Sequence, residues 1–201
     1  DLAFLVMDLC ERGLRADANR LLNRYLSDSD DELAQIEGLA ALPLFLSLRA
    51  AIRAKVIVPR IRSEPRKQRL QSEALAYFDA AVRFLRPVPP RLIAIGGLSG
   101  TGKTTLAAAI APALGQAPGA VHLRSDVERK RHFAVAETTR RPAGAYRREV
   151  TATIYGKIHE LVEKALRAGR VVIADATHHH LDEREAIAAV ASRAGVPFLG
   201  L

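Results

Sequence analysis

The sequence contains one cysteine, Cys10, so a disulfide bond within the chain is impossible. We therefore expect a protein of the reducing cytoplasm. Long hydrophobic runs are also absent: the most apolar stretch, Leu39 to Leu48, is about half as long as the roughly 20 residues that span a membrane, and Pro43 interrupts it. The first residues lack the basic, apolar and small-residue succession of a signal peptide. These absences predict a soluble protein with no membrane partner.

Hydrophobic residues make up 49% of the chain, which is enough for a packed core and argues against disorder. No internal repeat or low-complexity tract is present. The chain starts at Asp1 without a methionine and stops at Leu201 directly after an apolar run, so we expect both ends to lie inside a longer protein.

The first part of the chain carries apolar side chains at helical spacing. The pattern predicts one helix that stops near Gly13, a second with its apolar stripe at Leu21 to Leu26, a third between Pro43 and Pro59, and a fourth that Pro65 opens. Prolines at positions 87, 89 and 90 then favour a stiff, extended connector. We therefore predict a helical domain at residues 1–86, a linker at 87–90 and a second domain at 91–201.

Beyond the linker, short apolar runs alternate with helical stretches, which is typical of a parallel sheet covered by helices on both faces. The predicted strands are Leu92 to Ile95, Val121 to Leu123, Val171 to Ala174 and Pro197 to Leu201. The predicted helices run from about Gly102 to Leu114, Asp126 to His132, Tyr146 to Ala168 and Leu181 to Ala194, with a loop containing Pro142 and Gly144 before the third.

Between the first of these strands and the first of these helices, Gly97 to Thr104 matches the pattern G-x-x-x-x-G-K-[ST]. The glycines let the backbone curl so that N–H groups face phosphate oxygens, and the helix N-terminus adds the positive end of its dipole. Lys103 would reach the β- and γ-phosphates, and the Thr104 hydroxyl would coordinate Mg²⁺. The predicted nucleotide-binding residues are Gly97, Leu98, Ser99, Gly100, Thr101, Gly102, Lys103, Thr104 and Thr105.

This motif predicts ATP and Mg²⁺ as cofactors. It also completes the fold class: an α/β, three-layer P-loop NTPase domain with a parallel sheet that is incomplete at the C-terminus, preceded by an all-helical segment. Asp175 ends the third apolar strand, and ligands of such sheets bind at the carboxyl ends of strands. We therefore predict Asp175 as a second Mg²⁺ ligand, directly or through water, with an ordinary loop cap as the alternative.

Asp126 follows the second strand and should lie on the same edge of the sheet. A carboxylate there can accept the proton of an attacking hydroxyl while Lys103 and Mg²⁺ hold the transferred phosphoryl group. Arg129, one helical turn later, would grip substrate or phosphate. The predicted catalytic residues are thus Lys103, Asp126 and Arg129; the alternative for Asp126 is a helix cap.

Two further groups of polar residues follow less specific patterns. Three adjacent histidines at 178–180 rarely converge on one metal, so a polar loop near the substrate is favoured, with Thr177 and Arg184 as candidate contacts. A basic cluster can meet a phosphorylated substrate or a nucleic acid, or can simply solvate a helix and loop. Its members are Arg124, Arg129, Lys130, Arg131, Arg140, Arg141, Arg147 and Arg148.

With these motifs in place, the chain resembles a fused bacterial family in which an aminoglycoside phosphotransferase-like domain precedes a P-loop predicted kinase. In the second part the resemblance lies in Gly96 to Thr104, in the D-x-x-R segment Arg124 to Lys130 and in Asp175 to Thr177. In the first part it lies in Asp1 to Leu5, Asn23 to Leu26 and Leu48 to Lys55, which are similar to the helical tail of the phosphotransferase-like domain.

The resemblance implies that Asp126 is the base acting on the acceptor hydroxyl, with Arg129 as its companion. It also implies an upstream phosphotransferase-like domain fused to this chain, and a lid and an adenine-contacting segment beyond Leu201. We therefore expect a kinase that transfers the γ-phosphoryl group of ATP to a hydroxyl of a small-molecule acceptor. The alternatives are a polynucleotide 5′-kinase or nucleotide-sugar kinase, and a nucleotide-binding regulatory module.

Overall fold

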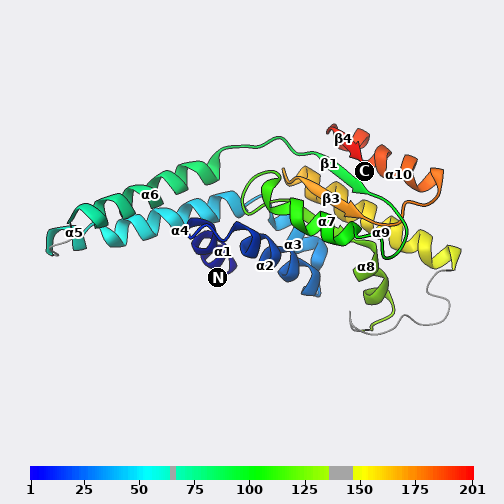
Figure 1. Cartoon of the computed structure of the whole chain (residues 1–201), viewed down its shortest axis with the longest axis horizontal. Helices are drawn as coiled ribbons and strands as arrows, with labels where there is room; N and C mark the ends of the chain where they lie inside the picture. Colours follow the sequence, from blue (N-terminus) through cyan, green and yellow to red (C-terminus); the bar gives the residue numbers. More distant parts are fainter. Residues whose placement is uncertain (64–66, 136–146) are drawn as a thin grey trace.

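A computed structural model of the chain describes residues 1–63, 67–135 and 147–201. The first part is helical, and the second part is a parallel four-stranded sheet with helices on both faces (Figure 1). The predicted fold class is therefore confirmed. Several residues used above lie outside the described residues, namely Pro65, Arg140, Arg141, Pro142, Gly144 and Tyr146.

The helical part begins with three helices that pack around Val6, Met7 and Leu22. The sequence pattern did not predict α3, which starts where the Asp31 carboxylate accepts a hydrogen bond from the Ala34 N–H (3.1 Å), nor the single turn α5. Over the described residues the helices are α1 (Leu2–Glu11), α2 (Arg15–Asp28), α3 (Glu32–Gly38), α4 (Leu42–Ile57), α5 (Arg60–Ser63) and α6 (Lys67–Leu85).

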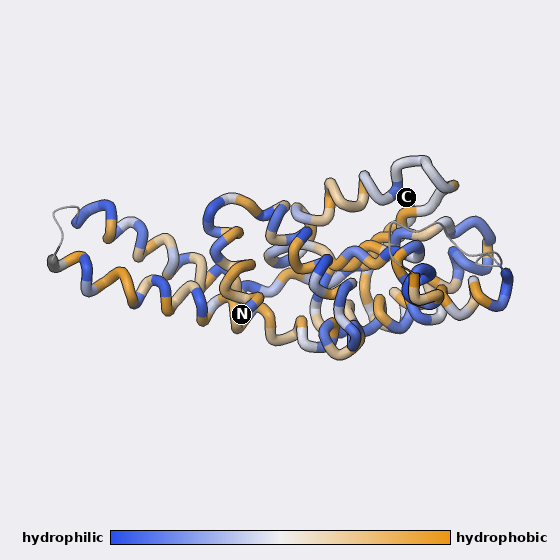
Figure 2. Tube along the Cα trace, turned by 90° about the horizontal axis from the view of Figure 1, so that it is seen from below, coloured by the Kyte–Doolittle hydropathy of each residue, from blue (hydrophilic) through white to orange (hydrophobic). Residues whose placement is uncertain are grey.

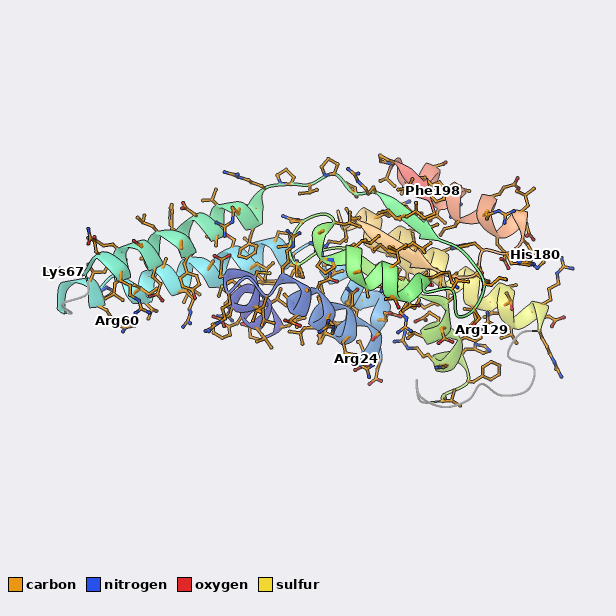
Figure 3. All side chains as sticks on the ribbon, viewed as in Figure 1. Arg24, Arg60, Lys67, Arg129, His180 and Phe198 are labelled. Atoms are coloured by element: carbon orange, nitrogen blue, oxygen red, sulfur yellow. The ribbon has the colours of Figure 1, made fainter. Side chains whose placement is uncertain are left out.

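α4 and α6 lie side by side as a long hairpin that projects from the rest of the chain, with Arg60 and Lys67 at its tip (Figures 1 and 3). Short hydrophobic and hydrophilic stretches alternate along both helices (Figure 2), and Leu70 of α6 packs against Ile57 of α4. Within the described ranges, no helix is both long and apolar enough to cross a membrane.

The four strands pair in the order β2-β3-β1-β4, and all of them run parallel. They are β1 (Leu92–Ile95), β2 (Val121–Arg124), β3 (Val172–Asp175) and β4 (Phe198–Gly200). The helices of this part are α7 (Lys103–Ile110), α8 (Ser125–His132), α9 (Arg148–Arg167) and α10 (Leu181–Ala194), with the 3₁₀ turn η1 (Ala111–Ala113) after α7. The predicted extension of α7 to Leu114 is wrong, because Pro112 has no N–H to continue the α-helical ladder.

Alternate residues of each strand point to opposite faces of the sheet. On one face Ile93 and Ile173 pack against Ala107 of α7. On the other face Leu92 and Val172 belong to a larger cluster that contains residues of α9, α10 and the helical part. Residues before and after the proline-rich connector therefore share one core, and the proposed division of the chain into two domains stays a prediction.

Helix α2 covers the free edge of β2, which is the outer strand of the sheet. Asn19 Nδ2 donates to the Ala120 carbonyl (3.0 Å), and Asn23 Nδ2 donates to the same oxygen (3.2 Å). Asn23 Oδ1 accepts from the His122 N–H (2.7 Å). Because residues four apart lie on one face of a helix, the two asparagines together provide partners for the Ala120 carbonyl and the His122 N–H at this strand edge.

The loop before β2 passes so close to α2 that only glycine fits at position 119. Gly119 has a φ of 142°, and a Cβ there would lie 2.4 Å from the Ala111 carbonyl oxygen and 2.7 Å from Asn19 Nδ2. The Arg15 guanidinium adds hydrogen bonds to the carbonyls of Pro118 (3.3 Å) and Gly115 (2.8 Å). These contacts fix α2 to the sheet.

A buried pair of acids joins the helical part to α8. Glu32 of α3 and Glu128 of α8 are both buried, and the Arg131 guanidinium pairs with each of them. Burial and the neighbouring Glu32 carboxylate raise the pKa of Glu128 to about 7, although Arg131 and Lys157 act in the opposite direction. One positive charge thus holds two carboxyl groups from distant parts of the sequence.

Replacing Asn23 by alanine should destabilise the fold. The substitution leaves the His122 N–H without its acceptor at a buried helix–strand contact, which costs about 1 to 3 kcal/mol of unfolding free energy. Urea denaturation measures this loss. Arg20→Gln on the exposed side of α2 should stay within about 0.5 kcal/mol of the parent. Equal unfolding free energies for Asn23→Ala and the parent would show that α2 does not depend on this edge contact.

Glu128→Gln should flatten the dependence of stability on pH. Because folding raises the pKa of Glu128 above its ordinary value of 4.5, the folded state binds more protons between that value and about 7, and stability falls as the pH rises through this window. The variant removes this ionisation, so between about pH 5 and pH 8 it should lose less stability than the parent, by on the order of 1 kcal/mol. Unfolding free energies at both pH values test this, with the exposed Glu160→Gln as control. Parallel pH profiles for parent and Glu128→Gln would contradict it.

Candidate active site

The P-loop connects β1 to α7 at the carboxyl edge of the sheet. Gly97, Gly100 and Gly102 have φ values of 134°, 84° and 88°, which glycine adopts without strain. A Cβ on Gly97 would also lie 3.2 Å from Thr101 Oγ1. The backbone is therefore curled as the motif predicts, and the predicted nucleotide-binding residues 97–105 all lie on this loop or on the first turn of α7.

Hydrogen bonds hold both ends of this loop. The Gly96 N–H donates to the Leu201 carbonyl (2.8 Å) and the Gly97 N–H to the Thr177 carbonyl (3.0 Å), which ties the start of the loop to the segments following β4 and β3. At its tip, Lys103 Nζ and Thr101 Oγ1 both donate to the Leu98 carbonyl, at 2.6 and 2.8 Å. The Lys103 ammonium group therefore lies over the loop that would hold phosphate.

β1 and β3 are neighbours, but their connections leave in opposite directions, to β2 and to β4. Such a switch point opens a crevice at the carboxyl ends of the two strands, where ligands of parallel sheets bind. The P-loop follows β1 at this point, and Asp175 is the last residue of β3. The topology thus brings the two predicted Mg²⁺ ligands to one place.

Thr104 and Asp175 are in direct contact. Thr104 Oγ1 donates to Asp175 Oδ2 at 2.6 Å, and His122 Nε2 lies 3.1 Å from the same oxygen. The side chains of Asp175 and His122 are only 4% and 8% exposed. Burial alone would raise the pKa of Asp175, but the hydrogen bonds from His122 and Thr104 hold it below its ordinary value, so this carboxyl group stays ionised.

The arrangement fits a hard divalent cation. A hydroxyl and an ionised carboxylate are the oxygen ligands that Mg²⁺ prefers in nucleotide sites. His122 was not predicted; the only sign in the sequence is a polar residue inside the apolar strand β2, and its contact with Asp175 requires the pairing of β2 with β3. We assign His122 the role of orienting Asp175.

Asp126 lies in the first turn of α8, directly after β2. The interpretation of Asp126 as a helix cap is wrong, because α8 starts at Ser125 and its cap position is Arg124, with no side-chain hydrogen bond. Arg124 lies beside Asp175 in the strand register, so Asp126 follows closely on the same edge of the sheet. Its carboxylate is 31% exposed and lies 3.5 Å from Lys130 Nζ.

Arg129 of α8 contacts α9. Its side chain is buried, and its guanidinium donates to Thr151 Oγ1 of α9 at 3.3 Å. The hydrogen bond therefore joins α8 to α9. The structure brings Lys103, Thr104, Asp175 and Asp126 to one edge of the sheet, whereas it turns Arg129 towards α9.

The segment after Asp175 is organised by hydrogen bonds within the chain. Thr177 Oγ1 lies 3.0 Å from the Tyr155 hydroxyl, which also accepts from the His178 N–H (3.1 Å). The Arg184 guanidinium donates to the carbonyls of His178 (3.2 Å) and His179 (3.1 Å). His178 is buried while His179 and His180 are exposed, and the described part of the chain contains no group of three metal-ligating side chains.

Three cations of the basic cluster make internal contacts in the part of the chain that the structure describes. Lys130 pairs with Asp126, Arg131 with Glu32 and Glu128, and Arg129 with Thr151. These three cations help to pack α8. Binding of phosphate or nucleic acid by the cluster stays a prediction.

Similar proteins occur in mycobacteria. The uncharacterized protein Mb2027c of Mycobacterium bovis and the uncharacterized protein Rv2004c of Mycobacterium tuberculosis are each 29% identical to the chain over 181 residues. These residues cover 88% of the chain and 34% of each relative, so the chain spans about a third of the length of these curated relatives. No solved structure matches the chain significantly.

A family model described as an AAA domain matches residues 92–200, which is just over half of the chain. The matched range starts at β1 and contains the P-loop, Asp126, Asp175 and all four strands. The chain therefore belongs to this AAA domain family, and its second part is a P-loop nucleotide-binding domain of kinase-like type.

Proposed function

We propose that this chain is the nucleotide-binding part of an ATP-dependent kinase that phosphorylates a hydroxyl group of a small-molecule acceptor. The observation that supports it most is the 2.6 Å contact between Thr104 and Asp175. This contact joins the P-loop helix to the end of β3, and in our proposal its two side chains provide oxygen ligands for Mg²⁺ beside the γ-phosphate of a bound nucleotide.

Each predicted residue has a separate task in this proposal. Lys103 neutralises charge on the β- and γ-phosphates, and Thr104 and Asp175 hold Mg²⁺, which supplies further charge neutralisation when bound. The acceptor oxygen bonds to the γ-phosphorus while the bond to the β,γ-bridging oxygen breaks, and ADP leaves. Asp126 takes the hydroxyl proton. Arg129 supports α8, and with it Asp126, through its hydrogen bond to Thr151.

We further propose that the helical part is the tail of an upstream aminoglycoside phosphotransferase-like domain, as the sequence resemblance implies. The length of the curated relatives, about three times that of the matched segment, supports additional domains in the longer protein.

The test is transfer of label from γ-labelled ATP into a fractionated cell extract by the full-length protein that carries this chain. A labelled small metabolite supports the proposal. Label on oligonucleotide ends or on a nucleotide sugar would favour the alternative kinases, and ATP hydrolysis without any labelled acceptor would favour a regulatory module.

Lys103→Ala should reduce transfer by on the order of 100- to 1,000-fold, because the variant lacks the cation that offsets developing phosphate charge. The Lys103 ammonium group donates to the Leu98 carbonyl of an exposed loop, so the thermal midpoint should change little. Radiometric transfer assays and a thermal melt measure the two effects. Unchanged transfer would remove Lys103 from the mechanism.

Asp126→Asn should reduce transfer by on the order of 100-fold or more while ATP binding persists, because the amide cannot accept the hydroxyl proton. Calorimetric titration with ATP and Mg²⁺ measures binding separately from transfer. Glu160→Gln, an exposed acid on α9, serves as a control for the lost negative charge. A parallel loss of ATP binding and transfer in Asp126→Asn would assign this residue a structural role.

A further inference from the structure

A cavity of about 230 Å³ lies between α2 of the helical part and the nucleotide-binding part. α2 forms one wall, and α7, β2 and the start of α8 form the other. The lining residues that matter below are Ala16, Arg20, Asn23, Thr104, Arg124 and Glu128. The cavity is therefore made jointly by the two parts of the chain, and neither part forms it alone.

The cavity adjoins the predicted phosphate and Mg²⁺ site. Thr104 lines it, and the hydroxyl of the same residue holds Asp175. Arg124 also lines it and lies beside Asp175 in the strand register, two residues before Asp126. A molecule in this cavity would be a direct neighbour of the residues proposed to act on the γ-phosphate.

The α2 wall is held in place by the contacts on the β2 edge. Asn19 and Asn23 bond to the backbone of Ala120 and His122, and Arg20 lies between them in the sequence of the helix. The backbone of Arg20 is therefore held in a fixed position relative to β2.

The charges that line the cavity favour an anionic ligand over a cationic one. Its acids, Glu32 and Glu128, are both paired with Arg131. Among the described residues Arg20 pairs with Asp17, and because their side chains are 78% and 51% exposed, this pair is weak and yields readily to a ligand. The Nε atom of Arg124 is buried without a hydrogen-bond partner in the described part of the chain. An anionic group would satisfy both guanidinium groups.

Building on the kinase function proposed above, we propose that this cavity is the acceptor site and that α2 helps to determine specificity. The acceptor is a small hydroxylated molecule with a phosphate or carboxylate group, which Arg20 and Arg124 bind. The volume is below the roughly 300 to 1,000 Å³ typical of pockets for drug-sized ligands, which suits a metabolite and not a polymer.

The experiment uses the full-length protein and a cell extract separated by anion exchange into an anionic and a neutral metabolite pool. With γ-labelled ATP, label should enter the anionic pool. Phosphatase treatment of that pool before the assay separates the two sources of negative charge: lost labelling indicates a phosphate-bearing acceptor, and retained labelling a carboxylate-bearing one.

Two variants test the α2 wall. Arg20→Gln should raise the amount of anionic pool needed for half-maximal labelling about 10-fold, as expected for one lost bond to a charged group, with similar labelling at saturation. Ala16→Phe should block the cavity and abolish acceptor labelling. Both should bind ATP as the parent does. Arg167→Gln, which removes another exposed arginine paired with an acid on its own helix, should match the parent.

The outcomes separate this inference from the kinase proposal. Labelling of the neutral pool, or an Arg20→Gln variant equal to Arg167→Gln, would overturn the acceptor site and leave the kinase function standing. Absence of transfer to either pool would overturn both.

Discussion

The structure depends on the contact between α2 and the outer strand β2. An exposed strand edge carries backbone donors and acceptors that need partners, and here a helix supplies them through two side-chain amides. Asn19 and Asn23 are one helical turn apart, so both meet the strand from a single helix face. This contact positions the helical part against the nucleotide-binding part and thereby forms the wall of the cavity beside Thr104.

The nucleotide site itself follows from strand order. Because β1 and β3 are adjacent and their connections leave in opposite directions, the P-loop and Asp175 lie at the same crevice, and the hydrogen bond from the Gly97 N–H to the Thr177 carbonyl joins their two loops. His122 adds a buried hydrogen bond that keeps Asp175 oriented and, with Thr104, ionised. The hydrogen-bonded group around Asp175 therefore combines His122 of β2, Asp175 of β3 and Thr104 of α7.

Local patterns predicted the fold class, the curled P-loop and the approach of Thr104 to Asp175, since each follows from a short motif or from where a strand ends. They failed where a contact joins residues that are far apart in the sequence, and where a single residue changes the local backbone structure. His122 meets Asn23 across 99 positions in sequence, and no periodicity reveals such a contact. The end of α7 was misplaced because Pro112 ends the α-helical hydrogen bonding despite the high helical propensity of its alanine neighbours. Asp126 was misjudged as a possible cap because α8 already begins at Ser125.

The occupied edge of β2 also decides how the sheet can grow. Since α2 lies where another strand would have to pair, neither a second copy nor a peptide can be added on that side. A further strand would therefore have to pair beside β4, the other outer strand of the sheet.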